Sequence, residues 1–179
     1  MELEVVLKER RSVRKYQADR KVDKAVVEEL IQAAILAPSW KNSQTARYYC
    51  VMSEEMLKKV KEECLPEFNR ASCADAPVLL VTTFVRDRSG FGRDGKPDNE
   101  VGNGWGYYDL GLHNENLLLK AKDLGLDTLV MGIRDGERLG KLLEIDSNQI
   151  VVAVIALGYG NAAPEMPKRK AVDEIARFY

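Results

Sequence analysis

Two long apolar runs limit what this chain can fold into. Residues 76–85 are largely apolar and rich in β-branched side chains, and every residue of 150–157 is apolar. Runs of this length and composition are typical of strands that are buried on both faces. We therefore expect two central strands covered by other elements. The chain has 179 residues, which suffices for one sizeable core.

Helices and shorter strands are predicted around these runs. Apolar residues recur at three- and four-residue steps over 24–35, and Asp23 is a suitable N-cap. Ser53 is expected to cap a helix over 53–64, and a further helix is predicted over 107–124, ended by Gly125. Segments 47–52 and 128–133 are strand candidates. The sequence shows neither an internal repeat nor an interdomain linker, so a single domain over 1–179 is expected.

A basic stretch, residues 10–16, follows a short amphipathic segment near the start of the chain. It reads Arg-Arg-Ser-Val-Arg-Lys-Tyr, and the apolar Val13 and the aromatic Tyr16 interrupt its cations. This interruption indicates a segment anchored in a fold. Arginine side chains match the oxygens of a phosphate. Two interpretations stay open from this stretch alone: a phosphate clamp, and a solvated basic end of a first helix.

Two polar loops are candidates for ligand contacts. Residues 37–44 form an amide-rich loop between a predicted helix and a predicted strand, a common place for binding residues. The alternative is that Pro38 ends the helix and the next residues close a turn. Residues 86–106 form a long glycine-rich connection, and loops of this length are usually functional or disordered. We expect either a lid over a binding site or a surface excursion whose aromatic residues pack on the core.

The composition argues against several classes of protein. Lys and Arg total 27 against 28 for Asp and Glu, which disfavours a nucleic-acid or membrane-surface protein. No apolar run is long enough to span a bilayer and the first residues do not resemble a signal peptide, so a cytoplasmic location is expected. Three cysteines without a C-x-x-C pair indicate neither a disulfide framework nor a zinc site.

Single residues complete this inventory. Cys50 is expected to be a buried strand residue. His113 is the only histidine, which argues against a His-rich metal site and a Ser-His-Asp triad. We expect it to be bonded to a neighbouring residue.

Five segments, in this order, resemble the FMN-dependent nitroreductase family, and the resemblance covers nearly the whole chain. They are 10–14, 37–44, 109–111 with 116–117, 124–126 leading into 131–133, and 157–160 ahead of 168–170. The resemblance implies an α+β fold, a three-layer α/β/α sandwich around a mainly antiparallel sheet. It also implies an intertwined homodimer with FMN at the subunit interface and a C-terminal arm over 161–179.

The resemblance also implies a set of cofactor-binding residues. Arg10, Ser12 and Arg14 would hold the FMN phosphate and ribityl chain, and Arg11 would replace or assist Arg10. Residues from the partner chain would reach the flavin, namely Pro38, Ser39, Asn42 and Gln44. Met131, Gly132 and Ile133 would lie beside the isoalloxazine ring. Arg169, with Lys168 or Lys170, would close the phosphate site.

A chain with one histidine and with neither a predicted metal site nor a catalytic triad suits hydride transfer from NADH or NADPH to FMN. The cofactor carries the reactivity in such a reaction, and no side-chain acid, base or metal is needed. The implied cycle is ping-pong, with an acceptor such as a nitroaromatic or a quinone. Alternatives stay open: a flavin reductase or another specialised flavoenzyme on the same scaffold, and a flavin-binding module without turnover. A nucleic-acid binder is disfavoured by the charge balance.

Overall fold

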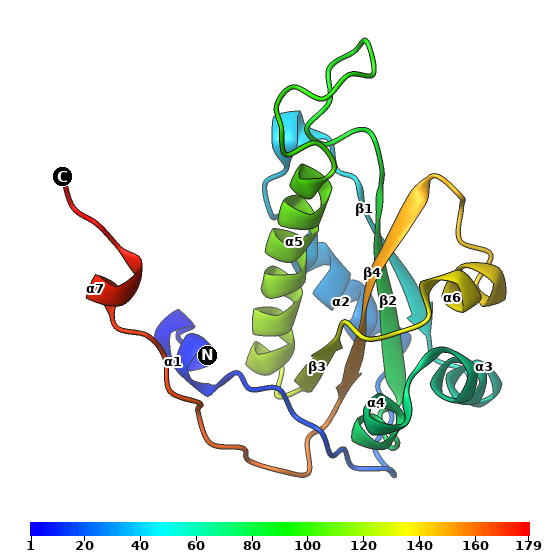
Figure 1. The fold of residues 1–179 in the computed structure, drawn as a ribbon. Coiled ribbons are helices and arrows are strands. Elements are labelled where there is room, and N and C mark those ends of the chain that lie inside the picture. The colour runs from blue at the N-terminus through cyan, green and yellow to red at the C-terminus, as the bar shows by residue number, and fades with distance from the viewer.

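A four-stranded antiparallel sheet forms the centre of the molecule. The computed structural model describes residues 1–179, and the strand order is β1-β2-β4-β3. The strands are β1 (Ala46–Val51), β2 (Val78–Val85), β3 (Asp127–Met131) and β4 (Gln149–Gly158), and all neighbouring pairs are antiparallel. The two apolar runs therefore form the two inner strands, β2 and β4, as their composition predicts (Figure 1).

Successive side chains of the inner strands face opposite sides of the sheet, and both sides are covered. In β2, Val78 and Leu80 belong to one core cluster, whereas Leu79 and Val81 belong to the other. This is the period of two that strand geometry imposes. Because both faces are buried, the run needs no polar alternation.

The first face is covered by two helices, α2 (Lys24–Ala34) and α5 (Gly104–Asp123). They contribute Val27, Leu30, Leu117 and Ala121 to a core with Ile155 and Leu157 of β4. The side chain of Asp23, the N-cap of α2, makes no capping hydrogen bond. The expected start of α5 at residue 107 is too late, because the last residues of the predicted loop already form its first turn.

The second face is covered by short helices. They are α3 (Glu54–Lys59), the π-helical turn η2 (Val60–Cys64), α4 (Glu67–Ser72) and α6 (Gly136–Leu142). The Ser53 side chain caps α3 by accepting a hydrogen bond from the N–H of Met56 at 3.3 Å. Helices on both faces give the predicted three-layer α/β/α arrangement (Figure 1).

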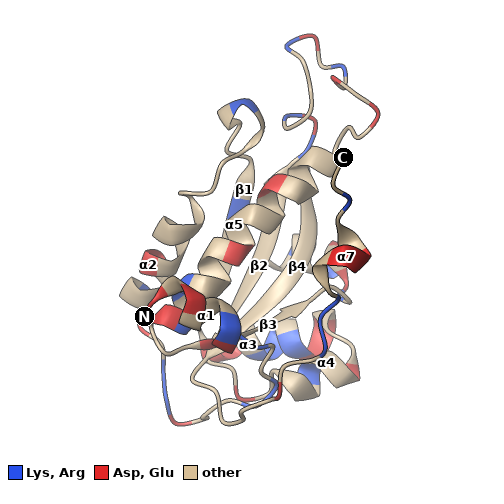
Figure 2. Ribbon diagram, turned by 90° about the vertical axis from the view of Figure 1, so that its left-hand side faces the viewer, with Lys and Arg blue, Asp and Glu red and all other residues tan.

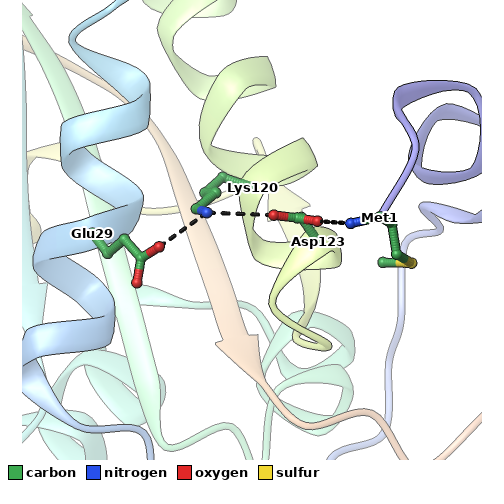
Figure 3. A network of polar contacts seen from close by, with 4 residues as sticks. All are labelled: Met1, Glu29, Lys120 and Asp123. Atoms are coloured by element: carbon green, nitrogen blue, oxygen red, sulfur yellow. Dashed lines mark hydrogen bonds and ion pairs between the residues drawn. The ribbon is translucent and has the colours of Figure 1, made fainter.

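Three short helices lie outside these layers: α1 (Leu3–Glu9), the 3-10 turn η1 (Trp40–Asn42) and α7 (Val172–Ile175). A network of polar contacts joins the first residue to α5 and α2 (Figure 3). The Asp123 carboxylate contacts the amino group of Met1, and the Lys120 ammonium lies 3.3 Å from Asp123 and 2.9 Å from Glu29. The start of the chain is thereby held against the C-terminal end of α5.

Residues 161–179 form an extended arm that leads away from the sheet (Figures 1 and 2). Nearly every residue of the arm is exposed. Its apolar side chains have no core to pack on within this chain. Residues 161–179 are thus a separate segment of this chain, and their role as an arm in a dimer stays a prediction.

Two expectations about single residues are wrong. Cys50 is exposed, and it lies on β1, an edge strand of the sheet. His113 is buried, and neither of its ring nitrogens has the expected hydrogen bond to a neighbouring residue. None of the helices combines the length and apolar character that a bilayer-spanning segment requires.

Candidate functional site

The basic stretch is anchored beside the edge strand β3. The N–H of Val13 donates to the carbonyl of Thr128 at 3.0 Å, and Ser12 forms an isolated bridge with Thr128. Val13 and Tyr16 are buried, and the Tyr16 hydroxyl donates to the Val13 carbonyl at 2.9 Å. Burial also raises the pKa of Tyr16, so this hydroxyl stays protonated. The apolar members thus fix the segment, as predicted.

The arginines of this stretch point in different directions. Arg10 lies beside α5, with its Nε 3.8 Å from a carboxylate oxygen of Glu115. Arg11 donates to the carbonyl of Arg10 at 2.7 Å and lines a separate cavity of about 310 Å³ with Lys122 and Asp127. Arg14 is exposed, and its only hydrogen bond is to the Ser12 carbonyl at 3.3 Å. Arg14 therefore has no carboxylate partner.

The segment after β3 presents unused backbone donors. Met131 is buried, whereas Gly132 and Ile133 are exposed. The N–H groups of residues 132–134 have no acceptor in the chain, and a Cβ at Gly132 would meet nothing within 4 Å. Backbone donors left without a partner are uncommon in folded proteins unless water or a ligand receives them. The surface over residues 132–134 is thus open and rich in donors.

Asn69 of α4 contacts the same segment. Its side-chain amide donates to the carbonyl of Ile133 at 2.8 Å, and the residue is buried. This contact fixes the direction of the backbone after β3. The Asn69 side chain also places an amide beside the open donors. Sequence reasoning missed this residue, since it lies in a segment without a recognisable motif.

Residues 38–44 of the polar loop predicted over 37–44, hereafter the 38–44 loop, have an unusual conformation. Lys41, Asn42 and Gln44 all have positive φ, between 47° and 55°, which is uncommon for residues other than glycine. The Ser39 hydroxyl accepts a hydrogen bond from the N–H of Gln44 at 3.0 Å and closes the turn. Pro38 precedes this turn and is exposed.

Asp109 of α5 fixes this loop to the helix layer. Its buried carboxylate accepts the N–H of Trp40 at 3.0 Å and also the hydroxyl of Ser89 from the 86–106 loop. Both polar loops are therefore attached to one carboxylate. Sequence reasoning singled out the 109–111 motif but did not predict this role.

Within one chain, the predicted site residues fall into three groups. Ser12 lies beside Thr128, three residues before Met131, which corresponds to about 10 Å along a strand. The 38–44 loop lies beside the N-terminal end of α5 (Figure 1). Lys168 and Arg169 are on the arm, and neither has a hydrogen bond or ion pair with residues 10–14.

Comparison with known proteins decides the family. The model of the nitroreductase family matches residues 7–159 of this chain. The chain belongs to the nitroreductase family. The predicted resemblance is thereby confirmed, and the fold described above is the fold of this family.

Relatives and solved structures of the nitroreductase family agree with this assignment. A protein of Archaeoglobus fulgidus, named as a candidate NADH dehydrogenase/NAD(P)H nitroreductase, is 32% identical over 161 residues, which is 84% of this chain and 80% of that protein. A nitroreductase family protein from Streptococcus pneumoniae has a TM-score of 0.84 at 23% identity and covers 99% of this chain and 100% of its own.

A third similar protein comes from Exiguobacterium sibiricum. It is a candidate nitroreductase whose structure was solved in complex with FMN, with a TM-score of 0.83 and 21% identity, and it covers 100% of this chain and 98% of its own. At this identity the likeness shows the shared fold.

Proposed function

We propose that this nitroreductase-family protein transfers a hydride from NADH or NADPH to bound FMN and then to an acceptor such as a nitroaromatic or a quinone, in a ping-pong cycle. The observation that carries the proposal is the combination of one arginine without a carboxylate partner, Arg14, and unused backbone donors along β3. Ser12 and Arg14 lie near its start, and the N–H groups of 132–134 follow its end. Relatives named for NAD(P)H chemistry and a neighbour solved with FMN support it.

The donor set at the start of β3 fits a phosphate. Arg14 is exposed and has no carboxylate partner, and the Ser12 side chain is exposed beside it. A guanidinium in this state gains more from a phosphate than one already paired with a carboxylate. Arg10 is half-buried near Glu115 and adds positive charge on the side of α5. Arg11 faces another cavity, and its role stays a prediction.

The donor set at the end of β3 fits a flavin ring. The N–H groups of Gly132 and Ile133 would donate to ring heteroatoms, and the exposed Ile133 side chain offers an apolar contact. The Asn69 amide holds the Ile133 carbonyl and thus keeps these donors directed outward. When bound, FMN supplies the hydride-accepting chemistry. The chain's part is to bind and orient the ring and to favour negative charge beside its N–H groups.

We also propose a homodimer in which each site takes residues from both chains. The 38–44 loop, with Pro38, Ser39, Asn42 and Gln44, would approach the partner's flavin. The arm supports this assembly, since Phe178 is 87% exposed and Val172 and Ile175 are 65% and 71% exposed. Apolar side chains on an extended segment are stabilised when a second surface covers them. Lys168 and Arg169 travel with this arm and would complete the phosphate site in the assembled dimer.

The organisation of the chain follows from this proposal. Residues 1–179 would act as one FMN-binding domain, with 86–106 as a lid and 161–179 as the arm. All three cysteines are free, which suits a reducing compartment such as the cytoplasm.

The absorption spectrum of the purified protein tests the proposal. Flavin bands that bleach on anaerobic addition of NADH or NADPH, and return when a quinone is added, are the expected result. A protein that stays colourless after incubation with FMN would refute the proposal. Bound flavin that neither NADH nor NADPH reduces would indicate a flavin-binding module without turnover.

A variant locates the phosphate site. Arg14→Ala should weaken FMN binding by roughly 1–3 kcal/mol, or about 5- to 150-fold in Kd, the usual scale for a lost charged hydrogen bond. Lys58→Ala is a matched control, since Lys58 is an exposed cation on α3 without a bonded partner. Unchanged FMN affinity in Arg14→Ala would show that the phosphate binds at another place.

The dimer has its own test. Replacing both Ile175 and Phe178 by Asp should convert the sedimenting species from dimer to monomer and lower FMN occupancy. Asp173→Asn on the same arm should leave both unchanged. A wild-type protein that sediments as a monomer with a full complement of FMN would contradict the shared site.

A further inference from the structure

A second cavity lies between the 38–44 loop and the loop that joins β2 to α5. Its volume is about 550 Å³, within the range of about 300–1,000 Å³ that is usual for small-molecule sites. Two aromatic residues and three cations lie among its lining residues: Trp40, Phe91, Lys41, Arg88 and Arg93. No residue proposed above for the flavin lines it except Asn42.

The charge of this cavity is unbalanced. Lys41 is paired with Asp98 at 2.6 Å, but Arg88 and Arg93 have neither an ion pair nor a side-chain hydrogen bond. Asp87 is the only carboxylate in the lining, and it already accepts the amide of Asn103 at 2.8 Å. Two guanidiniums therefore remain available for an anion. Figure 2 shows charged residues of both signs along the loop between β2 and α5.

The walls of the cavity are held from several sides. Asp109 binds the backbone of Trp40 and the hydroxyl of Ser89, and the Trp40 ring lies 4.5 Å from the ring of Trp105. Within the loop, the N–H of Gly92 donates to the carbonyl of Lys96 at 2.8 Å. These contacts make the loop a hairpin with fixed ends. The arginines thus start from a preorganised frame, which lowers the cost of binding.

Polar atoms on the Trp40–Ser43 wall also lack partners. The indole Nε1 of Trp40 and the hydroxyl of Ser43 are buried without a hydrogen bond in this chain. Lys41, Asn42 and Asp87 line the cavity with positive φ, at 47°, 55° and 58°. Strained backbone and unsatisfied polar atoms gather at ligand sites more often than elsewhere.

We infer that this cavity binds the adenosine 2′-phosphate end of NADPH and makes NADPH the preferred donor. The inference rests on the proposed function, which requires a nicotinamide donor. An adenine base stacks on aromatic rings and on arginine planes, and a phosphate dianion pairs with two guanidiniums. NADH has a hydroxyl in place of this phosphate, so Arg88 and Arg93 would gain little from it.

The position of the cavity agrees with this assignment. Asn42 and Ser43 line it and also belong to the loop proposed to approach the partner's flavin. A dinucleotide with its nicotinamide over that flavin would thus place its adenosine end on the same loop. The β2–α5 hairpin would then select the donor, in addition to any role as a lid.

Binding of adenosine phosphates tests the inference directly. Calorimetry with adenosine 2′,5′-bisphosphate and adenosine 5′-monophosphate should show at least about tenfold tighter binding of the bisphosphate, the scale of one charged contact. The double variant Arg88→Gln/Arg93→Gln should lose this discrimination. Lys96→Gln is the matched control, because Lys96 is an exposed cation on the same loop that neither lines the cavity nor pairs with a lining residue, and this variant should keep the discrimination.

The donor preference is the second readout. The ratio of kcat/KM for NADPH to that for NADH should fall about tenfold or more in the double variant, with FMN content and circular dichroism unchanged. Equal binding of the two adenosine phosphates by the wild-type protein would overturn the inference. A discrimination that survives in the double variant would also overturn it.

The two proposals fail in different ways. If the protein binds FMN and both nucleotides bleach it equally well, the donor assignment is wrong and the oxidoreductase proposal stands. If the protein binds the bisphosphate tightly but takes up no FMN, the cavity is a nucleotide site and the proposed function is wrong, and with it the assignment of a hydride donor.

Discussion

The buried carboxylate of Asp109 accepts the backbone N–H of Trp40 at 3.0 Å, so the conformation of the 38–44 loop depends on a residue of α5. The same oxygen accepts the hydroxyl of Ser89. One side chain therefore holds two loops. The first is proposed to reach the partner's flavin, and the second is proposed to recognise NADPH. Loss of this side chain would affect both.

Asp109→Ala should lower the free energy of unfolding by about 1–3 kcal/mol, because it leaves buried donors of two loops unsatisfied. Asp109→Asn keeps an acceptor oxygen and should lose less. Urea unfolding monitored by tryptophan fluorescence measures both, and limited proteolysis should show faster cleavage in 86–106 for the alanine variant. Equal stability of all three proteins would contradict this role.

Gly106 should not tolerate a side chain. A Cβ at this position would lie 2.3 Å from ring atoms of Phe84, which is fully buried. Gly106→Ala should therefore destabilise the protein by about 1–3 kcal/mol, the scale of an overpacked core. Gly140→Ala in α6 is the control: no atom lies within 4 Å of the added Cβ, so it should gain about 0.5–1 kcal/mol from helix propensity. Thermal unfolding of the two variants should shift in opposite directions.

His113 should make the protein less stable at acidic pH. Burial lowers the pKa of this imidazole, and the nearby Asp109 carboxylate opposes that effect without cancelling it. The unfolded chain, with a pKa near 6.5, then binds the proton before the folded protein does. The contribution of neutral His113 to the free energy of unfolding is complete above about pH 7.5. It is lost as the pH falls through 6.5, with a slope of at most about 1.4 kcal/mol per pH unit.

Urea unfolding at pH 7.5 and pH 5.5 measures this effect. The wild-type protein should lose more stability between the two pH values than His113→Leu, which cannot be protonated at this position. The comparison between variants removes the contribution of the surface carboxylates, since both proteins share them. An equal loss in both proteins would show that folding does not lower the pKa of His113.

Of the three cysteines, only Cys50 should react with a thiol reagent in the native protein. Cys50 is exposed on the edge strand β1, whereas Cys64 and Cys73 are buried. Burial raises the pKa of all three thiols, that of Cys64 to about 11, so access to solvent and not acidity distinguishes Cys50. Titration with a disulfide reagent should therefore modify one thiol before denaturation and three after it. Cys50→Ser should abolish the native reaction.

The sheet and the main helices were predictable because each has a local pattern. The runs at 76–85 and 150–157 became β2 and β4, and the periodic segment from Lys24 became α2. A strand that is buried on both faces needs apolar residues at every position, and a helix that covers a sheet needs an apolar stripe. These requirements act on consecutive residues, so the sequence displays them. The family resemblance rested on such local segments as well.

The contacts between distant segments were not predictable in this way. Asn69 meets Ile133, and Asp109 meets Trp40, through packing that joins residues more than 60 positions apart. No local pattern encodes such a pair. The exposure of Cys50 was missed for the same reason, because it depends on which strand lies at the edge of the sheet. The roles predicted for the flavin-binding residues stay predictions.

The hairpin between β2 and α5 has a consequence for how such a protein can change over evolutionary time. Ser89 and Trp105 mark its two attached ends, one bonded to Asp109 and one within α5 itself. The residues between them project from the body of the molecule (Figure 1). Insertions, deletions and charge changes between these ends would leave the sheet and the β3 edge undisturbed. A lineage can therefore exchange this tip and acquire a new substrate preference while inheriting the rest of the molecule unaltered.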